Sequence, residues 1–229
     1  MEECKIKNLY TLENTIAKPL LEKYTYPWEV LPNISDFIIE LGKKLPKEYD
    51  LIDENIWISK KAKITKSAYI KGPAIICEDA EIRHCAFIRG NAIVGKNTVV
   101  GNSTELKNCI LFDNVQVPHY NYVGDSILGY KAHMGAGSIM SNVKSDKKLV
   151  IIKNKITGEQ IETKRKKVGA MIGDYVEIGC GSVLNPGTII GKNTNIYPLS
   201  SVRGVIPQNS IYKNEKNIIT RADINNIKS

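Results

Sequence analysis

The sequence predicts an all-β protein folded as a parallel β-helix, in which short strands wind into stacked triangular coils. An aliphatic residue recurs every six positions between residues 52 and 100, and the fifth position of the same frame is small from the second hexad onward. Neither the period of an α-helix, about 3.6 residues, nor the two-residue period of a half-buried strand produces this pattern. The aliphatic series is Ile52, Ile58, Ile64, Ile70, Ile76, Ile82, Ile88, Val94 and Val100.

Three hexads make one coil of about 18 residues, whose aliphatic side chains fill the interior and whose small residues allow tight corners. A single coil buries little apolar surface, so stability comes from stacking on neighbours about 4.8 Å away. Two five-residue units, 106–110 and 123–127, interrupt the hexads. The register returns as Leu111 and Val117, as Leu128, Met134 and Met140, and later as Ile172, Ile178, Leu184, Ile190, Ile196 and Val202.

Segments outside the repeat follow other patterns. Residues 1–51 predict a helical segment, because apolar residues from Ile34 to Leu45 recur at helical spacing and predict a helix over 34–45. An earlier helix is expected near 11–24. The repeat forms one domain over 52–206, with an insertion at 143–167 whose β-prone runs within 149–163 predict a projecting hairpin. The polar tail, 207–229, includes a helix expected at 220–228.

Composition excludes several classes of protein. The chain has 229 residues, 42% of them hydrophobic and 24% charged, which is ordinary globular usage and unlike a disordered or collagen-like chain. No apolar run approaches the roughly 18 residues of a membrane span, and the N-terminus is charged where a signal peptide turns apolar. Five cysteines without CxxC spacing argue against a disulfide framework or a structural zinc site. We therefore expect a cytoplasmic protein without membrane contact.

Positive charge is concentrated in the insertion. Nine of the 32 lysines and arginines lie between Val143 and Lys167, against Asp146, Glu159 and Glu162, so this segment holds +6 of the net +8. The segment has no aromatic residue to interleave with the cations, which disfavours a nucleic-acid partner. A phosphorylated small molecule is the favoured partner, and a solvated surface hairpin is the alternative.

Coil geometry converts sequence separation into spatial neighbours. Arg89 and Lys107 occupy the second place of units three apart, so they are expected to stack on adjacent coils. Two neighbouring cations repel each other unless an anion or a carboxylate lies between them. We therefore expect a phosphate at this point, and the alternative is neutralisation by Glu105 or Glu81.

The same arithmetic gathers groups suited to proton transfer. Glu105 is expected beside Tyr122, and His119 lies in the same hexad as Tyr122. A histidine can act as a general base near neutral pH, and a nearby carboxylate can orient its ring and stabilise its protonated form. A lone histidine on a β-surface is more often merely exposed, so it is the clustering that favours catalysis.

These residues carry a resemblance to a known family. The run from Arg89 through Glu105-Leu-Lys107 to His119-Tyr-Asn-Tyr122-Val-Gly124-Asp125, followed by Gly135-Ala136-Gly137 and Asn142, resembles the acetyltransferase domain of the bifunctional glucosamine-1-phosphate N-acetyltransferase/N-acetylglucosamine-1-phosphate uridylyltransferase. Tyr26-Pro27-Trp28 and the segment Lys166–Ala170 look more like archaeal-type sugar-1-phosphate nucleotidyltransferases that end in the same coil. The resemblance covers about residues 20–206.

The resemblance implies a left-handed coil, acetyl-CoA as co-substrate, a homotrimer, no metal and a place in UDP-N-acetylglucosamine biosynthesis. His119 would be the general base that Glu105 orients. The residues implied to bind the sugar phosphate are Arg89, Lys107, Tyr122, His133, Asn142 and Lys148, and those implied to flank the coenzyme are Ala136 and Cys180.

Two departures limit what the resemblance implies. His133 stands where the motif has a sugar-contacting Asn, and Cys180 stands where it has a Ser, so the acceptor need not be glucosamine-1-phosphate. No Gly-rich nucleotide loop opens the chain, so nucleotide transfer is not expected. The alternatives are a binding or scaffold remnant without activity, and a γ-carbonic-anhydrase-like metalloenzyme using His84, His119 and His133.

Overall fold

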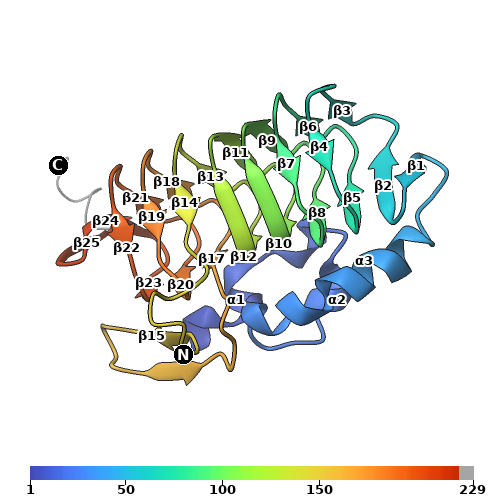
Figure 1. The fold of residues 1–229 in the computed structure, drawn as a ribbon. Coiled ribbons are helices and arrows are strands. Elements are labelled where there is room, and N and C mark those ends of the chain that lie inside the picture. Colours follow the sequence, from blue (N-terminus) through green and yellow to red (C-terminus); the bar gives the residue numbers. More distant parts are fainter. Residues whose placement is uncertain (222–229) are drawn as a thin grey trace.

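The computed structural model describes residues 1–221 and confirms a parallel β-helix whose coils stack along one axis (Figure 1). Three faces run along the coil. The face that we call the site face consists of β4 (Tyr69–Ile70), β7 (Phe87–Ile88), the first halves of β10 (Glu105–Leu111) and β12 (Tyr122–Leu128), β14 (Ile139–Met140), β19 (Val183–Leu184) and β22 (Ser201–Val202).

The second face, called the helix face, continues from the site face because β10 and β12 pass through the corner between them. It consists of β2 (Ile56–Ser59), β5 (Ala74–Ile76), β8 (Ala92–Val94), the second halves of β10 and β12, β17 (Ala170–Ile172), β20 (Thr188–Ile190) and β23 (Val205–Ile206). The third face consists of β3 (Lys63–Ile64), β6 (Glu81–Ile82), β9 (Val99–Asn102), β11 (Gln116–His119), β13 (His133–Met134), β18 (Glu177–Ile178), β21 (Asn195–Ile196) and β24 (Ser210–Asn214).

Antiparallel strands close both ends of the coil. β1 (Tyr49–Asp53) pairs with β2, and β25 (Asn217–Thr220) pairs with β24. Ile52 lies in β1 and is 62% exposed, so its prediction as the first interior residue is wrong. A helix is expected at 220–228, but Thr220 is the last residue of strand β25, and residues 222–228 lie outside the described residues.

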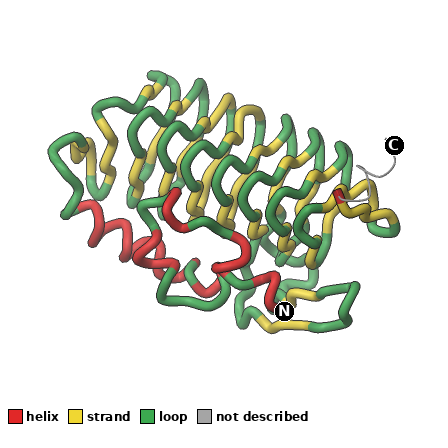
Figure 2. Tube along the Cα trace, turned by 180° about the vertical axis from the view of Figure 1, so that it is seen from behind, coloured by secondary structure: helices red, strands yellow, loops and turns green. Residues whose placement is uncertain are grey.

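The N-terminal segment covers the helix face (Figures 1 and 2). It contains α1 (Ile6–Leu9), α2 (Lys18–Leu21), α3 (Ile34–Gly42) and the 3₁₀ turns Glu2–Cys4, Leu12–Asn14, Pro27–Glu29 and Leu31–Asn33. The helix predicted over 34–45 is thus confirmed as α3, whereas the one predicted over 11–24 is broken into two short turns around Thr15. None of the described helices is long and apolar enough to cross a lipid bilayer.

The N-terminal segment covers the helix face because the strands of this face have apolar side chains pointing outward as well as into the coil. Each of its central strands has an interior aliphatic residue preceded by an outward apolar one, and the outward residues are fully buried: Ile75, Ile93, Ile110, Ile127, Met171 and Ile189. Trp57 of β2 is also buried, packed on Gly42 of α3. Burial of this apolar surface holds the N-terminal segment to the coil.

A buried carboxylate fixes the same junction. Asp174 is fully buried, and its side chain accepts hydrogen bonds from the backbone N–H of Thr11 at 2.7 Å and of Tyr130 at 2.9 Å. Lys192 Nζ lies 3.1 Å from the same carboxylate. Asp174 therefore joins the N-terminal segment to two neighbouring coils.

The insertion, residues 143–167, forms an arm. Its strands β15 (Ile151–Lys153) and β16 (Gln160–Glu162) pair antiparallel, which confirms the predicted hairpin. The arm leaves and returns through a bridge between Val143 and Lys167. Its turn reaches the N-terminus, where the Met1 amino group lies 3.3 Å from Glu159 (Figure 1).

Candidate active site

The coil register brings together most of the predicted phosphate-binding residues. Glu105 aligns with Phe87 on one neighbouring strand and with Tyr122 on the other, as the coil arithmetic predicts. Leu106 pairs in register with Ile88. The next residues along the two strands are Lys107 and Arg89, which therefore lie beside each other. These side chains belong to the site face, because alternate residues of a strand point to the same side.

Each cation has a carboxylate partner. Arg89 Nη1 lies 2.7 Å from Glu105 Oε1, and Lys107 Nζ lies 3.2 Å from Asp125 Oδ2. Of the two candidates for neutralising the cations, Glu105 therefore does so for Arg89, whereas Glu81 pairs with Arg83 instead. The Arg89–Glu105 pair is 45% and 33% exposed, so it contributes little stability and can be exchanged for another anion at small cost.

Asp125 is the centre of this group of residues, which we call the polar cluster. Its carboxylate is 5% exposed and accepts hydrogen bonds from Asn108 Nδ2 at 2.8 Å and Asn142 Nδ2 at 2.5 Å, besides its ion pair with Lys107. Asp125 and Asn108 both have positive φ, at the corner where the two five-residue units turn. Asp125 is part of the motif quoted above, but no role was predicted for it from the sequence. Its position in the five-residue unit 123–127 was the sequence feature that could have indicated a special role.

Tyr122 and Asn142 complete the polar cluster. Asn142 Nδ2 lies 3.4 Å from the Tyr122 hydroxyl, and the Tyr122 ring lies over Gly124, where a Cβ would come within 2.4 Å of that hydroxyl. Burial raises the pKa of Tyr122, and the negative charges of Asp125 and Glu105 raise it further, partly opposed by Arg89. The phenol is therefore protonated at neutral pH and can donate a hydrogen bond to an anion.

His119 lies at the end of β11, at the corner between the third face and the site face. Its backbone N–H donates to Asn121 Oδ1 at 3.1 Å, and the buried Asn121 side chain donates to the carbonyls of Gly135 and Ser138 at 2.9 and 3.0 Å. Asn121 thus fixes the corner on which the exposed imidazole stands.

The predicted coenzyme-flanking residues stack along the same corner. Gly137 N–H donates to the His119 carbonyl at 3.0 Å, and Gly181 N–H donates to the Ala136 carbonyl at 2.9 Å. Ala136 and Cys180 therefore occupy the next two coils after His119, at about 4.8 Å per coil. Gly137 has φ +68° and no atom lies within 4 Å of where its Cβ would be, so the backbone beside Ala136 is open to an approaching group.

Glu105 and Asn102 are two candidate acceptors for the His119 ring. Glu105 was predicted to do so, and its hydrogen-bond partner in the structure is Arg89. Asn102 is aligned with His119 on the neighbouring strand β9, and its Oδ1 is buried without a hydrogen-bond partner among residues 1–221. Asn102 was missed because its hexad position gives no signal beyond a polar residue on a strand.

The structure does not bring His133 and Lys148 to the polar cluster. His133 lies on the third face, where its Nδ1 is 2.8 Å from Glu177 Oε2 and where a cavity of about 350 Å³ opens beside Gln116. Lys148 is exposed on the arm. The arm lysine whose backbone lies beside the polar cluster is Lys167, because the next residue, Val168, donates its N–H to the Asn142 carbonyl at 3.0 Å.

The described part of one chain offers no group of side chains suited to a metal ion. Among the described residues, no three His, Cys, Asp or Glu side chains lie close enough to hold a metal ion. His84 and His119 share a corner two coils apart, about 10 Å, and His133 lies on the third face.

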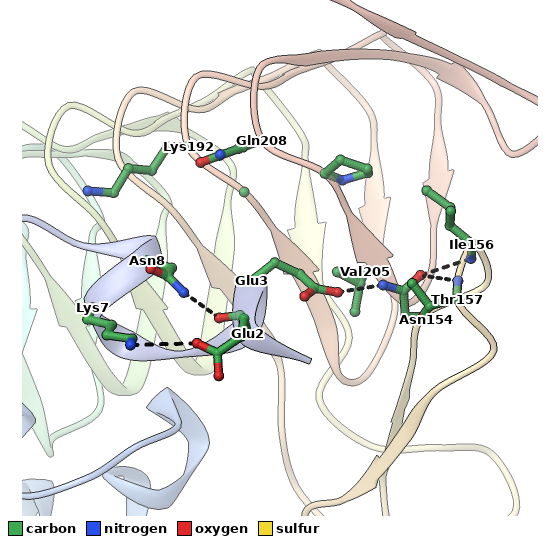
Figure 3. Close-up of a pocket in the computed structure, with 12 residues that line it drawn as sticks. Glu2, Glu3, Lys7, Asn8, Asn154, Ile156, Thr157, Lys192, Val205 and Gln208 are labelled. Atoms are coloured by element: carbon green, nitrogen blue, oxygen red, sulfur yellow. Dashed lines mark hydrogen bonds and ion pairs between the residues drawn. The ribbon is translucent and has the colours of Figure 1, made fainter.

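A larger cavity, of about 700 Å³, lies away from the polar cluster (Figure 3). It opens between the first N-terminal turn, the turn of the arm and the last coils, with Glu3 and Asn154 hydrogen-bonded across it. Lys192 and Gln208 line its far side. None of the predicted site residues lines this cavity.

Fold and site together define a hexapeptide-repeat β-helix protein with a cluster of paired charges on one face of the coil. The family described as the GMPPB C-terminal domain matches residues 70–169. The bifunctional protein GlmU of Methanococcus maripaludis is 38% identical over 118 residues, which are 51% of this chain and 28% of that protein. A bifunctional sugar-1-phosphate nucleotidylyltransferase/acetyltransferase of Sulfurisphaera tokodaii is 33% identical over 109 residues, 48% of this chain and 27% of that protein.

The predicted resemblance to such bifunctional proteins is confirmed, over about half of the chain. The matched part of the chain spans little more than a quarter of their length. Among solved structures, the acetyltransferase domain of PglB from Neisseria gonorrhoeae aligns with a TM-score of 0.34 and 15% identity, covering 72% of this chain and 57% of that chain.

Proposed function

We propose that this protein is a CoA-dependent acyltransferase that moves an acetyl group from acetyl-CoA to the amine of an amino-sugar phosphate. The observation that carries the proposal is the polar cluster, in which Arg89, Lys107 and the Tyr122 hydroxyl converge on the site face beside the His119 corner. The region matched by the GMPPB C-terminal family, residues 70–169, contains the whole cluster and His119.

The sugar phosphate binds between Arg89 and Lys107 in this proposal. Because the Arg89–Glu105 pair is partly exposed, a phosphate can replace the Glu105 carboxylate at Arg89 with little loss. Lys107 remains oriented by the buried Asp125, which also holds Asn142 for the sugar. Glu105 then no longer pairs with Arg89, and its carboxylate can turn toward the corner at which His119 lies.

His119 acts as the general base. The sugar amine attacks the thioester carbonyl carbon, so a C–N bond forms and the C–S bond breaks. His119 takes the proton from the attacking nitrogen and returns it to the CoA sulfur, which leaves as the thiol. Backbone groups at Ala136 and Gly137, one coil away, are close enough to guide the thioester.

The orientation of His119 is assigned to Asn102 or Glu105. An amide oxygen such as that of Asn102 fixes the tautomer of an imidazole, whereas a carboxylate also stabilises the protonated ring through its negative charge. The pH profile of turnover distinguishes them: Glu105→Gln shifts the lower apparent pKa downward if Glu105 is the partner. Asn102→Ala lowers the rate without such a shift if Asn102 is the partner.

We further propose that the active site is completed in a homotrimer. His133 and the polar cluster lie on different faces, and the remaining face is covered by the N-terminal segment. One site can therefore contain both only if two copies contribute. Tyr69, Phe87 and Ile139 expose apolar surface along the site face, which favours a partner there. Light scattering of the purified chain at a monomer mass of 25.5 kDa contradicts this assembly.

The test of function is release of free CoA thiol from acetyl-CoA, with glucosamine-1-phosphate, galactosamine-1-phosphate and an amino-sugar nucleotide offered in parallel. His119→Ala is expected to lower turnover about 10²–10⁴-fold, the usual contribution of a general base. His84→Ala is the matched control, because His84 is an exposed histidine of the same corner two coils away. Equal rates in both variants remove His119 from the mechanism.

A binding role without catalysis is the second candidate. It is favoured by one observation, that both cations of the polar cluster already have carboxylate partners and need no substrate to be stable. Binding of CoA and of a sugar phosphate by calorimetry, with no thiol released from any acceptor, supports this candidate over the enzyme.

A further inference from the structure

A second group of cations lines a small pocket between the arm and the coil, which we call the arm pocket. Four of its lining residues are cationic, Lys144, Lys153, Lys155 and Arg203, and the rest are Ile151, Pro186, Gly187 and Gly204. The cavity measures about 290 Å³. The charged residues come from two walls, the arm and the corner of the last coils.

Buried packing holds the two walls together. Val150 and Ile152, on either side of Ile151 in the arm, are fully buried. A Cβ on Gly187 would lie 2.7 Å from Val150 Cγ1, and one on Gly204 would lie 2.4 Å from the Lys153 carbonyl oxygen. Both glycines have φ +77°, so no other residue is accommodated without strain. The backbone of Lys153 therefore lies against the residue that follows Arg203.

The charges in the arm pocket are only partly balanced. Lys144 Nζ lies 3.1 Å from Asp146, and Lys155 pairs with Glu215. Lys153 and Arg203 have no carboxylate within 4 Å among residues 1–221, and Glu215, the partner of Lys155, acts on Arg203 only from a longer distance. The polar cluster of the site face is different, since there each cation has its own carboxylate.

Cations that line one small cavity and have no carboxylate within 4 Å attract an anion. Counting Asp146 and Glu215 against the four cations leaves a charge of +2 around the cavity (4 − 2). Arginine binds phosphate oxygens through its planar fork, and lysine binds them as a point charge. None of the described residues that line the pocket is aromatic, so none of them stacks on a base.

We propose that the arm pocket binds a diphosphate group, at a site separate from the polar cluster. Cations on two walls match an anion with two phosphate centres, and the charge of +2 matches an internal diphosphate. The cavity is at the lower end of ligand pockets, about 300–1,000 Å³, and so admits a diphosphate more readily than a whole nucleotide. The group can belong to the coenzyme, to a sugar nucleotide or to free pyrophosphate. This inference does not depend on acyl transfer.

The test is isothermal titration of the full chain with inorganic pyrophosphate at low ionic strength. Lys153→Ala and Arg203→Ala are each expected to weaken binding about 10-fold or more, the range of a lost charge-assisted hydrogen bond. Lys66→Ala is the matched control, because Lys66 is an exposed lysine outside the pocket, and it is expected to bind as wild type does. Arg89→Ala reports any pyrophosphate that binds at the polar cluster instead. Melting temperatures are expected to be unchanged in all four variants.

Three results overturn the proposal. They are no measurable binding of pyrophosphate to the wild-type chain, equal weakening in Lys66→Ala, and loss of binding in Arg89→Ala but not in Arg203→Ala. Competition identifies the source of the group once binding is found. Displacement of pyrophosphate by dephospho-CoA indicates the coenzyme, displacement by UDP alone indicates a sugar nucleotide, and displacement by neither indicates free pyrophosphate.

Discussion

Replacement of Asp125 by Asn tests whether the polar cluster depends on one buried carboxylate. The side chain is 5% exposed and accepts hydrogen bonds from Asn108, Asn142 and Lys107. An Asn side chain has one carbonyl oxygen, so it can accept from only one of the two amide donors, Asn108 or Asn142. Its NH₂ group then faces the NH₂ group of the other, and no hydrogen bond forms between them. Lys107, whose side chain is 26% exposed, also loses its counter-charge.

The magnitude follows from these contacts. A hydrogen bond to a charged group contributes about 1.5–3 kcal/mol, and a partly buried cation without a partner adds a further cost. We therefore expect Asp125→Asn to lower the free energy of unfolding by about 2–4 kcal/mol. Because Lys107 and Asn142 lose their common anchor, we also expect, for the acyl transfer proposed above, a KM for the sugar phosphate that rises more than kcat falls.

Glu105→Gln is the matched comparison, since it removes a carboxylate from the neighbouring ion pair of the same face. The Arg89–Glu105 pair is much more exposed, so its loss is expected to cost about 0–1 kcal/mol. Urea denaturation followed by circular dichroism gives both values. Equal stability losses in the two variants, or an Asp125→Asn protein as stable as wild type, would refute the reasoning from burial.

Three further outcomes are expected. Asp174→Asn should destabilise the chain by about 3–5 kcal/mol in the same assay, because a fully buried carboxylate loses its ion pair with Lys192, and a loss below about 1 kcal/mol contradicts this. Ile110→Ala should cost about 2–5 kcal/mol although it points out of the coil, whereas Ile139→Ala on the site face should cost under about 1.5 kcal/mol; the reverse order would argue against the helix cover. At pH 8 a thiol reagent should modify only the two exposed cysteines of the native chain, because burial raises the pKa of the thiols of Cys4 and Cys77 to about 12, and rapid reaction of a third thiol would contradict the burial.

The pH dependence of stability follows from the same buried thiols. Their pKa values are raised in the folded chain above the ordinary value of 9.0, so the unfolded state releases these protons first as pH rises. Their contribution to stability is full below about pH 8 and declines as pH rises above 9. A denaturation midpoint that increases between pH 8 and pH 10 is inconsistent with this assignment.

Coil arithmetic predicted the contacts of the polar cluster that run between adjacent coils. Arg89 beside Lys107 and Glu105 beside Tyr122 followed from unit counting alone, because parallel in-register stacking makes residues one coil apart immediate neighbours. The sequence also contains a signal for the helix face, because pairs of adjacent aliphatic residues such as Ile75-Ile76 recur at every third hexad. The hexad repeat does not reveal this face, because the repeat depends only on the interior residue of each pair.

Other features could not be read from the repeat. Asp125 has its role because two shortened units turn at one corner and stack there on Asn108, which depends on backbone φ values. His133 is predicted to join the site by its motif position, yet the corner between β11 and β12 separates its face from the polar cluster. The path of the arm depends on buried packing against Gly187 and Gly204, far along the chain.

The sequence by itself determined the stacked coil, its register and the neighbours within one face, since a short repeat specifies contacts that are always one coil away. The tertiary structure alone decided which face the N-terminal segment covers, how the arm lies and which carboxylate partners each cation. These outcomes depend on side-chain contacts between segments distant in sequence, such as Asp174 with Thr11, and no local period encodes them.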